Sequence, residues 1–238
     1  MGWMSIGENR FLPPTLIGKV HVKSFSTPTY QLLREQIRAD IISGLWALGT
    51  HVTIAQLSKH YDVSANPVRE ALLQLQGEGV IDMRMNRGAL VPVVDVAYVN
   101  NVCRLRGAVQ SMLAREAARL ATPEQIAQMK ALAEAHEAAA ATADTAACVT
   151  ANRALHHYID SLARNPQAKD VLDSRASLMD ASRRSLGYQP GRLDVVIAQH
   201  RKLVRAIARG DQDKAALASL EHTETARVDL VAMLSSKR

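Results

Sequence analysis

The first third of the chain alternates short helical stretches with polar breaks. Apolar side chains recur at every fourth position from residue 33 to residue 41, which predicts a helix that begins near Thr29 and ends at Gly44. A second, shorter helix is expected after Thr53. A third is expected after Ser64, a favourable capping residue, with Pro67 in its first turn, where a missing N–H costs little.

A period of two then replaces the helical period. Residues 80–84 and 89–93 are predicted to form two strands, and the Met-Asn-Arg-Gly connector at 85–88 favours a tight hairpin. Together with the three helices, this hairpin predicts a winged helix-turn-helix domain over residues 28–95. Residues 1–27 show no clear period and are expected to form a loosely ordered N-terminal arm.

Beyond residue 95 the pattern is almost wholly helical. Alanine and leucine dominate this region, and both have high helix propensity. Breaks rich in Pro, Gly and Asn separate six predicted helices, near 96–120, 123–142, 145–163, 167–187, 192–209 and 211–235. We therefore predict a mainly α protein, in which a winged helix-turn-helix with a small β-hairpin wing precedes an all-α bundle of about six helices that spans residues 96–235.

Charge and cysteine content narrow the picture only slightly. The net charge of +6 is compatible with a nucleic-acid partner, but residues 1–95 carry nine Lys or Arg against eight Asp or Glu, so the excess lies mostly in the helical region. Two cysteines, Cys103 and Cys148, give no disulfide framework. No apolar run approaches the ~20 residues of a membrane span, and the first ten residues lack the order of a signal peptide. We expect a cytoplasmic protein without membrane contacts.

The third helix of the winged unit is the candidate DNA-reading element. Such a helix places its N-terminal residues nearest the base edges of the major groove of a double-stranded operator. Arg69, one turn into the helix, is suited to a guanine or a phosphate. The other candidates share hydrogen-bonding groups or a place on the wing, and are Ser64, Asn66, Gln74, Arg84, Arg87 and Gly88. The alternative is a protein-binding winged helix whose arginines are solvated surface charges.

Residues 63–72, Val-Ser-Ala-Asn-Pro-Val-Arg-Glu-Ala-Leu, closely resemble the Val-Ser-Arg-Thr-Pro-Val-Arg-Glu-Ala-Leu segment of the GntR family of bacterial regulators. The Glu-Gly-Val at 78–80 and the Asn-Arg-Gly at 86–88 continue the resemblance, which implies a winged helix that binds DNA. Ala65 stands where the family usually has an arginine that contacts DNA, and Asn66 stands where it has threonine. Losing one such arginine should cost roughly 1–3 kcal/mol of base discrimination, so the usual operator sequence is not expected.

Residues 96–230 resemble the all-helical FCD effector domain of the FadR branch of that family. The residues that carry the resemblance are Arg104-Leu105-Arg106, Asn152-Arg153-Ala154-Leu155-His156, Arg164-Asn165-Pro166, the segment from His200 to Ile207, Gly210-Asp211 and His222. In many members an Asp-x-x-x-His pair and two later histidines hold a divalent metal inside the bundle. The resemblance therefore implies metal ligands at Asn152, His156, His200 and His222.

The spacing of these residues independently favours an interior position. Asn152 and His156 are four residues apart, so they share one face of a helix, and that face is otherwise apolar. His200 lies within an apolar stripe, and His222 is flanked at helical spacing by two alanines. Three inward histidines suit Zn²⁺, Ni²⁺ or a similar ion, although each could instead be a hydrogen-bonded core residue. Asn152 is a weaker ligand than the carboxylate of the family, and His157 is expected at the surface.

These features predict a ligand-responsive transcription regulator rather than an enzyme. A homodimer would bind an inverted repeat, and a small organic acid would bind beside the metal, with Arg106 and Arg183 as candidates to clamp it. Helix-surface ion pairs are the alternative role of these two arginines. A metal sensor without an organic effector and a metal-dependent hydrolase are the alternative functions, and the hydrolase lacks an acidic residue tied to the histidines by spacing.

Overall fold

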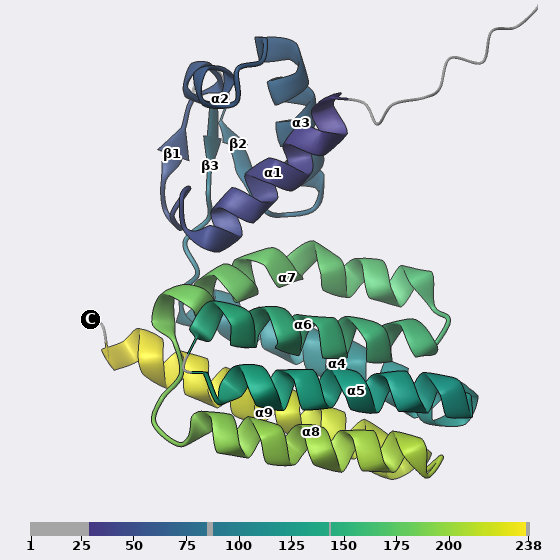
Figure 1. The fold of residues 1–238 in the computed structure, drawn as a ribbon. Helices are drawn as coiled ribbons and strands as arrows, with labels where there is room; N and C mark the ends of the chain where they lie inside the picture. Colours follow the sequence, from purple (N-terminus) through teal and green to yellow (C-terminus); the bar gives the residue numbers. More distant parts are fainter. Residues whose placement is uncertain (1–28, 85–87, 143, 237–238) are drawn as a thin grey trace, which may run out of the picture.

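The computed structural model describes residues 29–84, 88–142 and 144–236. Within these ranges a small unit of helices and short strands stands on a layered bundle of long helices (Figure 1). The predicted mainly α fold, with a winged helix-turn-helix and a six-helix bundle, is confirmed. The predicted N-terminal arm and the tip of the wing, including Arg87, lie outside the described residues.

The winged-helix unit contains the three predicted helices and one strand that the sequence pattern missed. Its elements are α1 (Thr29–Ser43), β1 (His51–Val52), α2 (Ile54–Tyr61), α3 (Ala65–Gly77), β2 (Asp82–Arg84) and β3 (Gly88–Leu90). The strands form an antiparallel sheet in the order β1-β3-β2, in which His51 and Asp82 both lie opposite Leu90. β1 was missed because two residues are too few to show an alternation.

Local signals explain where the second and third helices begin. Thr53 and Gln56 form a capping box at the start of α2, in which each side chain bonds to the backbone of the other residue. Asp62 then adopts a left-handed conformation, with φ of 52°, and ends α2. Ser64 occupies the capping position of α3 with extended backbone, but its hydroxyl makes no capping hydrogen bond within the described residues.

Six long helices form the bundle, and their bounds lie within a few residues of the predicted ones. They are α4 (Val96–Leu120), α5 (Pro123–Ala140), α6 (Thr145–Leu162), α7 (Pro166–Leu186), α8 (Arg192–Ala208) and α9 (Gln212–Ser236). The side chains of Asp95, Thr122, Asp144 and Asn165 cap the first four of these helices. α4 and α9 pack against each other along their lengths.

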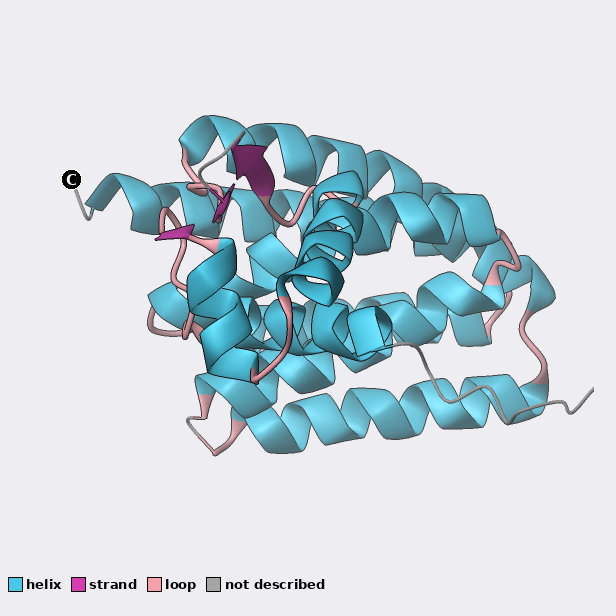
Figure 2. Cartoon of the chain, turned by 90° about the horizontal axis from the view of Figure 1, so that it is seen from above, coloured by secondary structure: helices cyan, strands magenta, loops and turns pink. Residues whose placement is uncertain are grey.

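The winged-helix unit rests on α7, which forms the layer of the bundle nearest to it in Figure 1. Leu178 and Met179 of α7 belong to the same buried cluster as Leu33 and Ile37 of α1, so the hydrophobic core continues past the domain boundary expected at residue 95. Seen from above, the unit covers the part of the bundle toward the end of α9 (Figure 2). A change in α7 can therefore reach α1 directly.

Gly88 provides a test of this architecture. Its φ is +94°, and an added Cβ would lie 2.2 Å from the carbonyl oxygen of Val52, because β3 passes close to β1. Gly44 has a similar φ of +89° with open space around it. G44A should therefore lose about 1–2 kcal/mol of unfolding free energy from its left-handed backbone alone. G88A should lose more, on the order of 3–5 kcal/mol, because it adds a backbone clash.

Urea unfolding followed by circular dichroism gives the two values. Equal losses for G88A and G44A would contradict the close approach of β1 and β3.

Candidate functional site

The start of α3 presents most of the predicted DNA-contacting residues to solvent. Ser64, Asn66 and Arg69 are exposed, and Ala65 is half-buried between them. Because the Ser64 hydroxyl is not used as a cap in the described structure, it is available to a phosphate together with the free N–H groups of the first helical turn. Arg84 is also exposed, on β2 of the wing.

Two other predicted DNA contacts have internal roles. The side-chain oxygen of Gln74 accepts a hydrogen bond of 3.1 Å from Arg34, which joins α3 to α1. Gly88 was expected to let the wing approach DNA, but it is buried and makes room for the Val52 carbonyl instead. We therefore leave Gln74 and Gly88 out of the DNA-contacting set, whereas Arg87 lies outside the described residues.

The three predicted histidines meet inside the bundle. His156 comes from α6, His200 from α8 and His222 from α9, and all three are buried. The Nε2 atom of His156 lies 3.2 Å from Nε2 of His200 and 3.1 Å from Nε2 of His222. Three ring nitrogens from three helices thus converge on one point. His157, one residue along, is half exposed and lies 3.6 Å from Asp173.

The spacing of the nitrogens fits a bound divalent cation. Zn–N bonds of about 2.0–2.1 Å place two ligand nitrogens about 2.9 Å apart at a right angle and about 3.4 Å apart at the tetrahedral angle. The two separations given above for His156 lie between these values. Hydrogen bonds satisfy the cluster less well, since one Nε2–H of His156 cannot be donated to both neighbours.

Burial keeps these imidazoles neutral, as metal ligands must be. It lowers the pKa of His156 to about 3, with a further contribution from the charge of Arg106. Burial, followed by the neighbouring histidines, holds the pKa of His200 well below its usual value. The pKa of His222 is also well below its usual value, for the same first cause. Neutral rings leave their lone pairs free for a cation.

Two partners of the histidines were not predicted. Gln199 accepts from Nδ1 of His222 at 3.1 Å, which fixes the proton on Nδ1 and leaves Nε2 bare. His136 of α5 is fully buried, and its Nδ1 lies 3.3 Å from Nδ1 of His200. The signal for His136 was its helical spacing from Met129 and Ala133. Alanines lie on both the buried and the exposed face of that helix, so the contrast between the two faces is weak.

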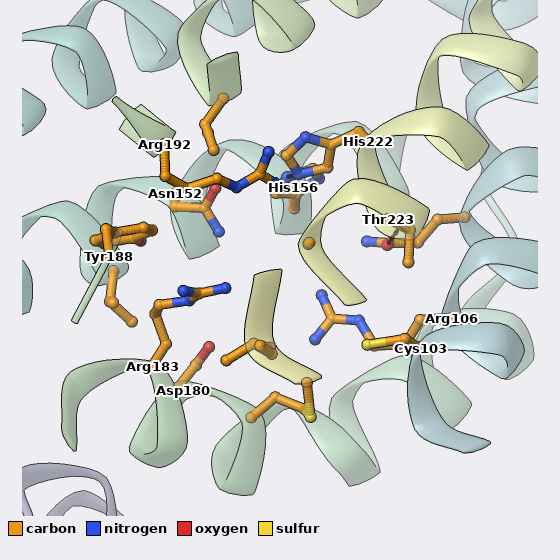
Figure 3. Close-up of a pocket in the computed structure, with 16 residues that line it drawn as sticks. Cys103, Arg106, Asn152, His156, Asp180, Arg183, Tyr188, Arg192, His222 and Thr223 are labelled. Carbon is orange, nitrogen blue, oxygen red and sulfur yellow. Dashed lines mark hydrogen bonds between the residues drawn. The ribbon is translucent and has the colours of Figure 1, made fainter. Parts of the chain in front are cut away.

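A pocket opens beside the histidines (Figure 3). Its cavity volume is about 90 Å³. Asn152, His156 and His222 form part of the wall, and the rest consists of three arginines, the single acid Asp180, and neutral polar and apolar side chains. Asn152 therefore shares the pocket with two of the histidines, as predicted from its position four residues before His156.

Three arginines give the pocket a positive potential. Arg183 is buried and held by Asp229, at 2.6 Å, and by the ring of Tyr188, at 4.7 Å from its guanidinium carbon. Arg192, which was not predicted, is also buried, and its Nε–H has no hydrogen-bond partner among the described residues. Arg106 points from α4 toward Arg183 across the pocket (Figure 3).

Arg106 differs from the other two in having no fixed partner. No described residue forms an ion pair or hydrogen bond with its guanidinium, whereas Asp229 serves both Arg183 and Arg192. A surface ion pair was the alternative role predicted for both arginines. Arg183 instead forms an interior ion pair with Asp229, and Arg106 forms no ion pair with a described residue. A guanidinium without a partner can take a carboxylate in a bidentate manner.

Comparisons with known proteins agree with both parts of the fold. Residues 29–91 match the family described as bacterial regulatory proteins, gntR family, and residues 101–225 match the FCD domain. No helix in the described ranges is long and apolar enough to cross a membrane. The winged helix and its helical effector-binding domain define a DNA-binding transcription regulator, not an enzyme.

Two curated regulators align with this chain over most of their length. The HTH-type transcriptional repressor RspR of Escherichia coli (strain K12) is 25% identical over 197 residues, which cover 83% of this chain and 86% of RspR. The HTH-type transcriptional regulator YdhC of Bacillus subtilis (strain 168) is 21% identical over 198 residues, or 82% of this chain and 88% of YdhC.

Solved structures show the same fold. E. coli McbR/YncC superposes with a TM-score of 0.76 at 19% identity, covering 89% of this chain and 99% of that one. A GntR transcriptional regulator from Rhodococcus sp. RHA1 gives a TM-score of 0.70 at 18% identity, with 85% and 97% covered. The chain belongs to the GntR family of bacterial regulatory proteins and carries an FCD domain.

Proposed function

We propose that this regulator is a homodimer whose affinity for an inverted-repeat operator changes when a divalent metal and a small organic acid occupy the FCD pocket. The observation that carries the proposal is the position of α7. One face of this helix supplies Asp180 and Arg183 to the pocket, while Leu178 and Met179 pack into the core shared with α1. An acid that contacts Arg183 more strongly in one arrangement of α7 shifts the population of that arrangement, and with it the placement of the winged helices.

Base recognition is assigned to the exposed start of α3 and to the wing. Ser64 and the first-turn N–H groups suit a phosphate, and Asn66 and Arg69 suit base edges. Because Ala65 offers no hydrogen bond, Arg69 carries a larger share of the discrimination than it would beside a second arginine. Arg84, with Arg87 beyond the described residues, is assigned to flanking phosphates or the minor groove.

Replacing Arg69 tests this assignment. An operator is first selected from a random double-stranded DNA library with the intact protein. R69A should bind that operator at least about 10-fold more weakly, because each of the two half-sites loses a bidentate base contact of roughly 1–3 kcal/mol. R209A, at an exposed end of α8, is the control and should bind as the wild type does. Fluorescence anisotropy at fixed salt measures both.

Selection of no sequence, or equal binding by R69A and the wild type, would contradict the proposed recognition helix.

The dimer interface is assigned to the outer surface of α4 and α9. Four large apolar side chains on this surface are 43–53% exposed, namely Leu105, Met112, Leu217 and Leu220. They form one patch, because α4 and α9 pack together and Leu220 lies over Gly107, 3.1 Å from where a Cβ would stand. A second copy of the chain would cover the same patch on both subunits, as a two-fold axis requires.

A glutamate in this patch should separate the subunits. We expect the wild type to sediment as a dimer and L220E as a monomer, since a buried unpaired carboxylate is costly in an apolar interface. V195E is the matched control, because Val195 is 46% exposed on α8, away from the patch. Sedimentation velocity distinguishes the species, and a monomeric wild type or a dimeric L220E would show the assignment to be wrong.

The metal is assigned to His156, His200 and His222, with Asn152 as a neutral neighbour. A bound divalent ion supplies positive charge and coordination positions for a carboxylate. The free guanidinium of Arg106 is placed to hold the other end of the acid, and the cavity limits that acid to a small one. In this arrangement metal binding depends on the histidines, whereas acid binding depends on the histidines and Arg106 together.

Two variants separate these roles. H200A should lose Zn²⁺ binding and, with it, acid binding. R106A should keep Zn²⁺ but lose most affinity for the acid, because a charge-assisted contact is removed. Isothermal titration with ZnCl₂, and then with a panel of small mono-, di- and hydroxycarboxylates, measures both steps. If Zn²⁺ alone changes operator affinity and no acid binds, the protein is a metal sensor and the acid assignment fails.

A further inference from the structure

A chain of polar contacts connects His200 to the ligand pocket through buried residues that the proposed metal site does not use. Nδ1 of His200 lies 3.3 Å from Nδ1 of His136, and Nε2 of His136 lies 3.5 Å from Sγ of Cys148. The Cys148 thiol lies 3.8 Å from the hydroxyl of Tyr188. His136 and Cys148 are 0% and 1% exposed, so water does not compete for the contact between them.

The chain has a single consistent direction once His200 presents Nε2 to a metal. A neutral imidazole carries one N–H, so the proton of His200 must then sit on Nδ1 and be donated to Nδ1 of His136. His136 consequently carries its own proton on Nε2 and donates it to Sγ of Cys148. The Cys148 thiol in turn donates to the hydroxyl of Tyr188. His136 and Cys148 each accept from one neighbour and donate to the next, with no donor left facing a donor.

We infer that His136 is a positioning residue, which holds the His200 ring and its tautomer for metal binding. The inference rests on the proposed metal site. A ligating histidine characteristically donates its second ring N–H to a neighbour, and losing that neighbour lowers metal affinity. Gln199 does this for His222, and His136 does it for His200. We assign no such second contact to His156.

The far end of the chain lies in the ligand pocket. The ring of Tyr188 supports the guanidinium of Arg183, whose carbon lies 4.7 Å from the ring centre. The same hydrogen-bonded chain therefore touches a metal ligand at one end and the arginine that lines the acid site at the other. His136 sits between the two sites, on a helix that contributes no residue to the pocket wall.

Metal affinity separates positioning from simple packing. The intact wild type, H136L, H136N and H157L are titrated with Zn²⁺ against a chromophoric chelator. H136L keeps the apolar volume but loses the acceptor, so its affinity should fall about 10–100-fold. H136N retains an amide oxygen near the position of Nδ1 and should stay close to the wild type. H157L removes an exposed histidine next to a ligand and should change nothing.

The Co²⁺-loaded proteins give a second readout. The visible spectrum of H136L should differ from that of the wild type, because a freed His200 ring changes the ligand field, while H136N should match the wild type. Circular dichroism checks folding. If H136L does not fold, C148A replaces it: loss of the acceptor for His136 should weaken Zn²⁺ binding, whereas C103A, at the other buried cysteine, should not.

The outcomes are distinct. If the wild type and folded H136L bind Zn²⁺ with equal affinity, the role of His136 is overturned and the metal site stands. Equal affinity of the wild type and C148A has the same meaning where C148A replaces H136L. Equal losses in H136L and H136N overturn it as well, because the shape of the side chain would then matter rather than its acceptor. A wild type that binds no Zn²⁺ overturns both the metal site and this inference.

Discussion

Four imidazole rings buried inside a helical bundle are the constraint on which the rest of this structure depends. They come from four helices, α5, α6, α8 and α9, so the bundle must hold these helices in register for the rings to meet. Burying a polar ring without a partner costs free energy, and partly satisfied networks are costly in an interior of low dielectric constant. Gln199, Cys148 and the rings themselves supply the partners, and the alanines at 133 and 218 leave room for them.

In the same bundle, a single helix, α7, contacts both the pocket and the DNA-binding unit. α7 lines the cavity with Arg183 and joins the core of the winged helix with Leu178, so no long chain of intermediates is needed to connect the two. The side chain of Arg175, also on α7, lies against Gly79 at the end of α3. Packed interfaces of this kind have discrete arrangements rather than a continuum. In the proposed mechanism, a small shift at the pocket would use such an arrangement to move the recognition helix.

Sequence reasoning worked where a feature is local and periodic. The helices, the hairpin and the inward histidines all follow from spacing along a single segment. It failed where a feature needs a partner far away in the chain. β1 exists only because β3 pairs with it, the role of Gly88 is set by Val52, and the place of Arg192 depends on Asp229. His136 had the right spacing, but alanine neighbours hid it.

Asn152 alters the charge balance of the pocket in a way that links metal to acid. Three neutral imidazoles and an amide bring no negative charge to a divalent ion, and Arg106, Arg183 and Arg192 add positive charge nearby. Acidic residues offset only part of this, since Asp229 is shared by two arginines and Asp180, in the pocket wall, pairs with Arg153. A carboxylate at the position of Asn152 would permanently offset one of the two positive charges of the ion. With an amide there, we propose that the acid supplies the missing negative charge, so that metal and acid would each strengthen the binding of the other.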